Sequence, residues 1–308
     1  MKTFKSLIEF QQHFNTDEAC RAHLEQVRWG GTPACPYCGS VNVHRFPNGK
    51  KFNCREKACH KNFTVTVGTI YENTKIPLTK WYLATYILTN HSKGISSMQL
   101  AQWLNVTQRT AWFVNHRIRE MLKENAPELT GEVQIDETYI GGKRQNKHAW
   151  QREELMRVHG PGYKEKTPVV GLLQNSGKVI AFKIEKAESA MLQPIVRKLV
   201  KQGATIMTDG HGAYKGLQGD YEHIVINHQQ GEYVVNGFHT NSLEGFWSLL
   251  KHQITGIHHS VSKKHLNRYC DEAAYRYNQR SLSQDEKFTH AIQCADNKRL
   301  RYAELIEK

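Results

Sequence analysis

The chain has 308 residues, 39% of them apolar, so it is long enough for one large domain or two to three small ones and too apolar to be disordered. It carries 42 Lys and Arg against 29 Asp and Glu, and the formal net charge of +13 favours nucleic acid as a partner. A membrane surface is the weaker alternative, because the charge is spread along the chain and no apolar run approaches the ~20 residues of a membrane span. The N-terminus also lacks a signal peptide's apolar stretch, so we expect a cytoplasmic protein with no membrane contact, associated with the nucleoid when it binds DNA.

Residues 1–28 are expected to form two N-terminal helices. Leu7, Phe10 and Phe14 recur at helical spacing. Thr16 is followed by Asp17 and Glu18, two acids that suit the positive end of a helix, so a second helix is predicted to begin there.

Residues 29–72 contain two close pairs of cysteines and are expected to form a zinc ribbon. The four thiols belong to Cys35, Cys38, Cys54 and Cys59. Each pair fits one tight turn, with Gly39 able to take the positive φ of the first, and a β-hairpin brings two such turns together around a tetrahedral Zn²⁺. The second pair is spaced less ideally, which makes His60 a possible substitute ligand. Four thiolates leave no open position, so the ion is interpreted as structural; incidental cysteines are the alternative.

Two β-prone stretches in this segment, Val41–Val43 and Phe63–Val67, are predicted to be strands. Because thiols stay reduced in the cytoplasm, the paired cysteines indicate metal binding and not disulfides. The remaining three cysteines lie in helical contexts and are interpreted as small core residues: Cys20, Cys270 and Cys294.

Residues 73–127 return to helical periodicity and contain a candidate helix-turn-helix. Ser96 or Ser97 can cap a short first helix, Asn105 suits a left-handed turn, and Thr107 can cap a second helix at 108–119. We expect this second helix to expose polar and basic side chains to phosphates and base edges, namely Gln108, Arg109, Asn115, His116, Arg117 and Arg119. A plain helical hairpin in a bundle is the alternative.

Residues 128–285 alternate strands with helices and are expected to form one α/β domain. Strands are predicted at 132–140, 168–173, 178–184, 205–208 and 223–226, and helices at 187–201, 240–252 and 262–279. Gln174–Gly177 is a good hairpin turn between the second and third strands. A charged loop at 143–167 interrupts the order after the first strand and either contacts DNA or is solvated. Residues 286–308 are expected to be a C-terminal helical tail.

Two acids occupy positions that favour metal binding. Asp136 lies within a β-prone run on a predicted middle strand, where a carboxylate is costly unless it is paired or bound to metal. Asp209 ends the strand at 205–208, and strand ends are where ligand sites form in α/β folds. Glu137, beside Asp136, points to the opposite face of the strand and is a weaker candidate.

The helix at 240–252 supplies a third acid. Its apolar residues recur at i, i+3, i+4 and i+7 and form one stripe, which consists of Leu243, Phe246, Trp247 and Leu250. A different face carries Asn241, Glu244, Ser248 and Lys251, with Glu244 and Lys251 two turns apart. The helix can therefore bury one side and present a carboxylate and an ammonium on another, a pattern that an ordinary surface helix shares.

Three converging carboxylates suit hard cations such as Mg²⁺ or Mn²⁺. Two such ions about 3.5–4 Å apart stabilise the attacking and leaving oxygens of an in-line phosphoryl displacement. In this interpretation Asp136 bridges both ions, while Asp209 and Glu244 each complete one. Lys251 contacts a DNA phosphate near the cut, and Asn241 supports a water or a phosphate.

Five stretches along the chain are more distinctive than these individual residues. They are Arg28–Gly31 ahead of Cys35–Gly39, then Gln134–Lys143, Thr208–His211, His239–Trp247 and Tyr275–Arg280. Together they resemble the zinc-ribbon DDE transposases of bacterial insertion sequences, the group related to the eukaryotic Merlin elements. The resemblance covers nearly the whole chain and is most specific around Asp136 and from Asn241 to Lys251.

The resemblance implies an RNase H-like catalytic domain of the DDE integrase type, for which the predicted strand and helix order is the expected one. It implies a divalent metal, terminal inverted repeats as substrate and integration into a target duplex. The family's catalytic acids align with Asp136, Asp209 and Glu244, and a basic residue two turns later aligns with Lys251. Some members are described with Asn as the third catalytic residue, which leaves Asn241 as an alternative. Glu244 is preferred, because a carboxylate holds Mg²⁺ better than a neutral amide.

Two other functions fit parts of the pattern. A metal-dependent nuclease or resolvase on the same fold would share the three acids but release the DNA ends without joining them. A transcription regulator with a zinc ribbon and a helix-turn-helix would use the large domain for dimerisation or ligand binding, without metal-dependent cleavage. For a transposase, two DNA ends must be handled together, so we expect a homodimer or a higher homo-oligomer.

Overall fold

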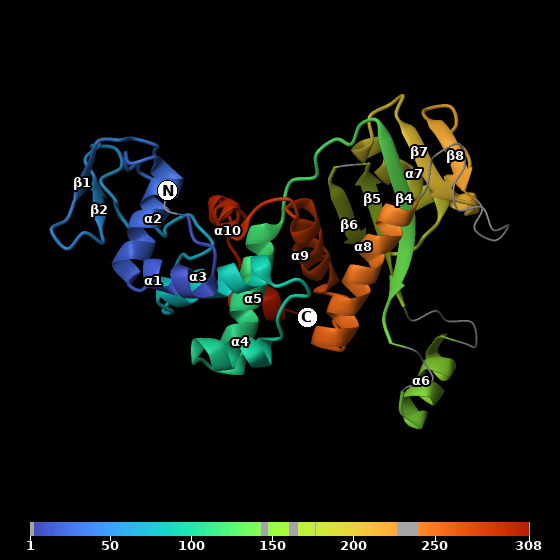
Figure 1. Ribbon diagram of the computed structural model, residues 1–308, viewed down its shortest axis with the longest axis horizontal. Coiled ribbons are helices and arrows are strands. Elements are labelled where there is room, and N and C mark those ends of the chain that lie inside the picture. Colours follow the sequence, from blue (N-terminus) through green and yellow to red (C-terminus); the bar gives the residue numbers. More distant parts are fainter. Residues whose placement is uncertain (1–2, 143–146, 160–165, 176, 227–239, 308) are drawn as a thin grey trace. The chain divides into compact units, whose positions relative to one another are not determined.

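The computed structural model describes residues 3–142, 147–159, 166–175, 177–226 and 240–307. The chain divides into two compact units, Met1–Glu124 with Gln279–Lys308 and Asn125–Asn278 (Figure 1). The C-terminal residues therefore join the first unit and do not form a separate tail from residue 286 onward. Among the helices described, none combines the length and apolar character that crossing a bilayer requires.

The first unit is built mainly from helices. They are α1 (Leu7–His13), α2 (Asp17–Trp29), α3 (Leu78–Asn90), α4 (Ser97–Leu104), α5 (Gln108–Leu122), α10 (Gln284–Gln293) and α11 (Tyr302–Ile306). Thr16 caps α2 as predicted, because its side chain accepts a hydrogen bond from the Ala19 amide at 3.2 Å. An aromatic cluster packs α10 against the N-terminal helices, with the Phe288 ring centroid 5.0 Å from that of Phe10.

A small antiparallel sheet follows α2 in the order β1 (Val43–Arg45), β2 (Phe52–Cys54) and β3 (Asn62–Phe63). The first predicted strand is thus shifted to begin at Val43, and the second, Phe63–Val67, is wrong beyond Phe63. Residues 65–68 form a turn, in which Gly68 has a φ of 75°. The Val65 carbonyl accepts a hydrogen bond from Arg28 Nη1 at 2.8 Å, a long-range contact that the β-prone residue types do not reveal.

The second unit contains a five-stranded sheet in the order β6-β5-β4-β7-β8. The strands are β4 (Glu132–Ile140), β5 (Thr167–Gln174), β6 (Val179–Lys183), β7 (Thr205–Asp209) and β8 (Glu222–Ile226). β4, β5 and β6 are antiparallel neighbours, whereas β7 and β8 run parallel to β4. All five predicted strands are present, in the order expected of an RNase H-like domain. Ser176 of the predicted hairpin turn lies outside the described residues.

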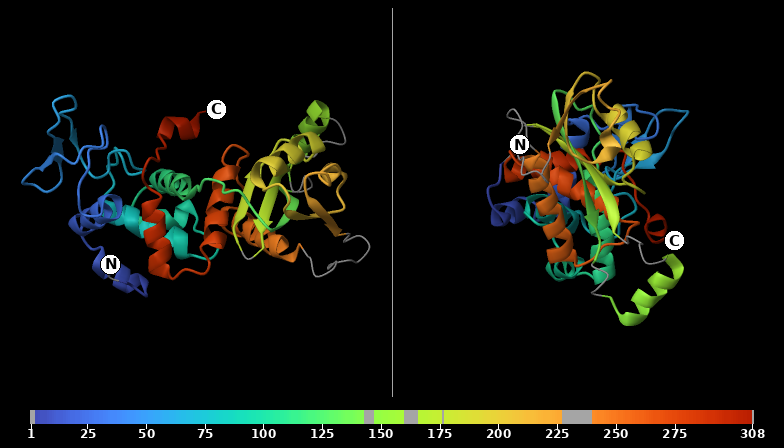
Figure 2. Two further views of the ribbon diagram at one scale, coloured as in Figure 1. Left: turned by 90° about the horizontal axis from the view of Figure 1, so that it is seen from above. Right: turned by 90° about the vertical axis from the view of Figure 1, so that its right-hand side faces the viewer.

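Helices cover both faces of this sheet. α7 (Ser189–Leu199) lies on one side, whereas α8 (Asn241–His252) and α9 (Leu266–Asn278) lie on the other (Figure 2). Ile135 and Leu172 belong to the core with α7, and Val169 and Leu173 to the core with α8 and α9. The alternation along β5 assigns each strand residue to one of the two faces.

The predicted loop at 143–167 is not entirely a loop. Residues Ala149–His159 form helix α6, and Thr167 already begins β5; residues 143–146 and 160–165 lie outside the described residues. The sequence of α6, AWQREELMRVH, is rich in strong helix formers, which explains the correction.

Candidate functional site

The four cysteines predicted to bind zinc come together in space. Their sulfur atoms all lie within 4.8 Å of one another, with Cys35 Sγ 3.7 Å from Cys59 Sγ and Cys38 Sγ 3.6 Å from Cys54 Sγ. A tetrahedral ion with Zn–S distances of ~2.3 Å places its sulfur ligands about 3.8 Å apart, so the arrangement fits Zn²⁺. Cys59 completes the group despite its longer spacing from Cys54, and His60 is not part of it.

Two backbone turns create this cluster. In the first, Gly39 has a φ of 75° and its amide donates to the Cys35 carbonyl at 2.8 Å. In the second, the amide of His60 donates to the Glu56 carbonyl at 2.9 Å, and His60 itself takes the left-handed conformation, with a φ of 46°. His60 therefore closes the longer turn through its backbone. The turns are joined by a hydrogen bond of 2.8 Å from Ser40 Oγ to Glu56 Oε1.

The two helices and the turn predicted for the helix-turn-helix segment are present as α4 and α5. Ser96 caps α4 and Thr107 caps α5, each by accepting a hydrogen bond from a backbone amide three residues later. Asn105 between them has a φ of 48°, as predicted for the turn. The predicted exposed face of α5 is largely wrong, however. Gln108 and Arg109 are exposed, but the other four expected side chains are buried, with exposed fractions of 1% for Asn115, 0% for His116, 4% for Arg117 and 1% for Arg119.

The burial of Arg117 shows why the prediction failed. Its guanidinium lies 5.1 Å from the ring centroid of Trp81 in α3 and donates a hydrogen bond of 3.1 Å to the Glu72 carbonyl. Burial lowers the pKa of Arg117 to about 10. Arg109 differs, because it stays exposed while its Nε donates to the Tyr302 hydroxyl of α11 at 2.7 Å. The exposed residues of α5, Gln108 and Arg109, therefore lie in its first turn.

The side chains of Asp136 and Asp209 project from neighbouring strands on the same face of the sheet. β4 is the central strand, and Ile135 pairs with Thr208 in the parallel register of β4 and β7. The next position on each strand is Asp136 and Asp209, so their side chains start side by side. Their face is the one that α8 covers, since Ile135 at the preceding position faces α7.

Two hydrogen bonds hold α8 against β4. The Leu243 amide donates to Gln134 Oε1 at 3.0 Å, and one turn later Trp247 Nε1 donates to Asp136 Oδ2 at 2.9 Å. The predicted apolar stripe of α8 is buried, and Glu244 is exposed beside it. The helical periodicity predicted the stripe but not these two hydrogen bonds. Nothing in the sequence pattern shows that Gln134 of β4 and Trp247 of the stripe bond across the two elements.

Asp136 and Glu244 line one pocket of about 510 Å³. The remaining lining residues are Glu137, Thr138, Trp247, Ser248, Lys251, His252 and Thr255. Lys251 thus shares the pocket with the two acids, as the two-turn spacing from Glu244 predicts. Asp209 and Asn241 are not among the lining residues; the Asp209 carboxylate instead accepts a hydrogen bond of 3.0 Å from the His211 amide.

The charges of Asp209 and Glu244 act on Asp136. Burial raises the pKa of Asp136, and the negative charges of Asp209 and Glu244 raise it further, while hydrogen bonds from the Glu137 amide and the Trp247 indole oppose the shift. Among the described residues, only the four cysteines form a metal-ligand group within 4.8 Å, so the three carboxylates are spread more widely than that.

Glu137 also lines this pocket, but its carboxylate bonds on the α7 side of the sheet. Its Oε2 accepts a hydrogen bond of 2.7 Å from the Tyr214 hydroxyl, which belongs to the core beneath α7. Burial raises the pKa of Glu137 to about 7, and the nearby charges of Asp136 and Asp209 add to the shift.

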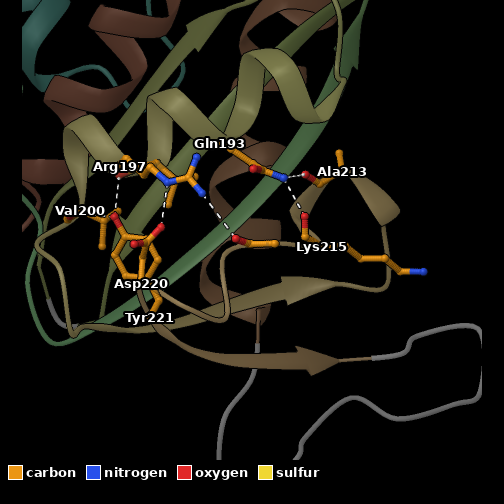
Figure 3. A network of polar contacts seen from close by, with 9 residues as sticks. Gln193, Arg197, Val200, Ala213, Lys215, Asp220 and Tyr221 are labelled. Atoms are coloured by element: carbon orange, nitrogen blue, oxygen red, sulfur yellow. Dashed lines mark hydrogen bonds and ion pairs between the residues drawn. The ribbon is translucent and has the colours of Figure 1, made fainter.

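The connection from β7 to β8, which begins directly after Asp209, is fastened to α7 (Figure 3). Gln193 Nε2 donates to two backbone carbonyls of this connection, at 3.2 and 2.7 Å. Arg197 Nε donates to Asp220 Oδ2 at 2.8 Å, near the start of β8. The polar face of α7 thereby fixes the path that the chain takes away from Asp209.

Comparisons with known proteins agree with the division of the chain into two units. Residues 128–278 match the family model described as the ISXO2-like transposase domain, and residues 15–62 match that of the transposase zinc-ribbon domain. The chain is also similar to an uncharacterized protein in transposable element ISH50 of Halobacterium salinarum (strain ATCC 700922 / JCM 11081 / NRC-1). The two are 28% identical over 256 residues, which cover 80% of this chain and 85% of that protein.

Two solved structures show a more distant likeness. The pre-cleavage Mos1 transpososome is 14% identical, with 68% of this chain and 73% of that chain covered at a TM-score of 0.28. The Mos1 strand transfer complex is 13% identical, with 66% and 78% covered at a TM-score of 0.21. These scores are too low to carry residue roles across to this chain.

Proposed function

The chain belongs to the ISXO2-like DDE transposases that carry a zinc ribbon, and from this premise we propose that Asp136, Asp209 and Glu244 are its catalytic acids. In this proposal the protein cuts DNA at the terminal inverted repeats of its insertion sequence and joins the ends to a target duplex. The observation that carries the proposal is the placement of the acids around the central strand. Asp136 and Asp209 each follow the paired residues Ile135 and Thr208 of β4 and β7, and two hydrogen bonds hold the Glu244-bearing turn of α8 against β4.

The donor set fits hard divalent cations. All three side chains offer carboxylate oxygens, the ligands that Mg²⁺ and Mn²⁺ prefer. The charges of Asp209 and Glu244 act on the half-buried Asp136, a repulsion that bound cations would neutralise. Asp136 would contact both ions, and Asp209 and Glu244 would each hold one. When bound, two such ions supply charge stabilisation for the attacking and leaving oxygens of phosphoryl transfer.

Glu244 is a better candidate than Asn241 for the third catalytic residue. Glu244 lines the same pocket as Asp136 and Lys251, whereas Asn241, the first residue of α8, does not. A carboxylate also binds Mg²⁺ more strongly than an amide. We assign Lys251 to a DNA phosphate, because its exposed ammonium enters the pocket two turns from Glu244. Asn241 is exposed one turn before Glu244, where its side-chain amide can form a hydrogen bond with a water or a phosphate.

DNA binding is assigned to the start of α5. Gln108 and Arg109 are exposed at its N-terminus, and the N-terminal residues of a recognition helix are the ones that contact base edges. Asn115 and Arg117 are withdrawn from this role because they are buried. Since the two ends of an element must be handled together, we expect the protein to act as a homodimer or a higher homo-oligomer.

A cleavage and joining assay tests the proposal. The protein is incubated with duplexes that carry the ends of its element and Mg²⁺, and the wild type is compared with Asp209→Asn. Glu185→Gln serves as the matched control, because Glu185 is an exposed carboxylate of the same unit outside the proposed site. Asp209→Asn should abolish cleavage, and Glu185→Gln should not.

Equal cleavage by the wild type and Asp209→Asn would remove Asp209 from the mechanism. Pre-cut ends distinguish a transposase from a nuclease on the same fold. The transposase joins such ends to a target duplex in the presence of Mg²⁺, and release without joining would instead support the nuclease.

A further inference from the structure

We propose that Trp247 is a positioning residue for Asp136, and that residue 171 is glycine because the Trp247 indole lies against its backbone. The proposal rests on the role assigned to Asp136 above. Neither residue follows from the three catalytic acids alone, since Trp247 lies in the apolar stripe of α8 and Gly171 lies in the middle of β5.

The contact joins three elements. Asp136 of β4 pairs with Gly171 of β5 in the antiparallel register, so the two residues lie opposite each other. Trp247 of α8 is 4% exposed and reaches across this pair, and its Nε1 donates to Asp136 Oδ2 at 2.9 Å. One end of the indole therefore holds the carboxylate while the ring covers the neighbouring strand.

Gly171 is required by this ring and not by its backbone conformation. A Cβ at residue 171 would lie 2.5 Å from Trp247 Cζ2 and 2.6 Å from Cη2, closer than real Cβ atoms approach. Gly171 is not among the glycines with a positive φ, so an L-residue would fit its backbone. Glycine in a strand interior weakens the strand and often marks a close approach of another group. Here the indole approaches most closely, and Leu243 Cδ1 is next at 3.1 Å from the position of a Cβ.

The indole bond restricts the carboxylate that would hold the divalent cations. With Oδ2 held, the carboxylate of Asp136 loses rotational freedom and keeps one orientation toward the pocket. The same bond also ties Asp136 to the helix that carries Glu244, one turn before Trp247. Outer partners of this kind typically contribute 10–100-fold to metal affinity.

The first experiment measures Mn²⁺ affinity of the full-length, zinc-loaded protein by electron paramagnetic resonance of free Mn²⁺. Trp247→Phe keeps an aromatic ring but removes the donor, and it should weaken Mn²⁺ binding about tenfold. Trp81→Phe is the matched control, because Trp81 is also buried and its indole also donates one hydrogen bond, of 2.8 Å to Thr74 Oγ1 in the first unit. Trp81→Phe should leave the Mn²⁺ affinity unchanged.

Asp136→Asn separates failure of this proposal from failure of the proposed function. If Asp136→Asn weakens Mn²⁺ binding and Trp247→Phe does not, Asp136 remains a ligand and the role of Trp247 is overturned. If neither variant changes Mn²⁺ binding, the metal site itself is overturned and the positioning role with it.

A second experiment tests Gly171 through a double-mutant cycle. Gly171→Ala should weaken Mn²⁺ binding about tenfold, or prevent folding, when Trp247 is present. In the Trp247→Leu background the same substitution should cost less than about twofold, because the shorter side chain does not fill that space. Equal effects in both backgrounds, or normal folding and Mn²⁺ binding of Gly171→Ala alone, would overturn the explanation for the glycine.

Discussion

Gln134 is predicted to hold the N-terminus of α8 in place, and Gln134→Met tests this. The side chain is completely buried; its Oε1 accepts from the Leu243 amide at 3.0 Å and its Nε2 donates to Asn175 Oδ1 at 2.6 Å. Methionine has a similar length but neither polar group. The substitution therefore removes both hydrogen bonds without creating a large cavity.

The magnitude follows from what each partner retains. An unpaired buried polar group costs about 1–3 kcal/mol. The Leu243 amide keeps a second acceptor, the Thr240 carbonyl at 3.1 Å, and Asn175 is only half-buried, so the lower part of the range applies. We expect Gln134→Met to lower the free energy of unfolding by about 1.5 kcal/mol, or about 3–6 °C in Tm for a unit of this size.

Hydrogen exchange measured by mass spectrometry localises the effect. Peptides from α8 should lose protection in Gln134→Met, together with a loss of DNA cleavage, because Glu244 follows the displaced Leu243. Asn175→Ala is the matched control. It removes the partner of Gln134 Nε2 but leaves the bond to Leu243, so α8 should keep its protection. If Gln134→Met also leaves α8 fully protected, the apolar stripe alone positions the helix, and the reasoning is refuted.

Three further outcomes are expected. Cys38→Ser should abolish zinc binding, measured by elemental analysis, and unfold the ribbon, because it removes one of the four thiolates that would hold the ion; a variant that retains zinc would contradict this. Burial, aided by the charge of His13, lowers the pKa of His23 to about 4 from 6.5, so below pH 6.5 the unfolded chain takes up a proton that the folded chain does not. Stability should therefore fall between those two values and level off below the lower one, and denaturant titrations of the wild type should lose about 2 kcal/mol relative to His23→Phe from pH ~7.5 to ~4.5; parallel curves would argue against it. Arg109→Ala should weaken binding to element ends about tenfold in fluorescence anisotropy at constant salt and change the Tm little, because its hydrogen bond to Tyr302 is exposed. Arg117→Met should lower the Tm; the reverse pattern would mean that the exposed and buried arginines were assigned to the wrong roles.

Local signals in the sequence were sufficient for much of this protein. The cysteine pairs predicted the zinc cluster because each pair needs only its own turn. Thr16, Ser96 and Thr107 predicted helix starts because a cap bonds to an amide three residues away. The order of strands and helices along the chain matched that expected of an RNase H-like domain, and the spacing in α8 identified its buried side.

The tertiary structure decided what local periodicity leaves open. A helical pattern separates two faces but does not say whether a polar face meets water or another helix, and for that reason Arg117 of α5 was expected at the surface. Residue types alone likewise give no sign that Gly171, Gln134 and Trp247 support the acidic residues. Their roles depend on register and on atoms brought together from strands and a helix far apart in the chain, and only the folded packing determines those distances.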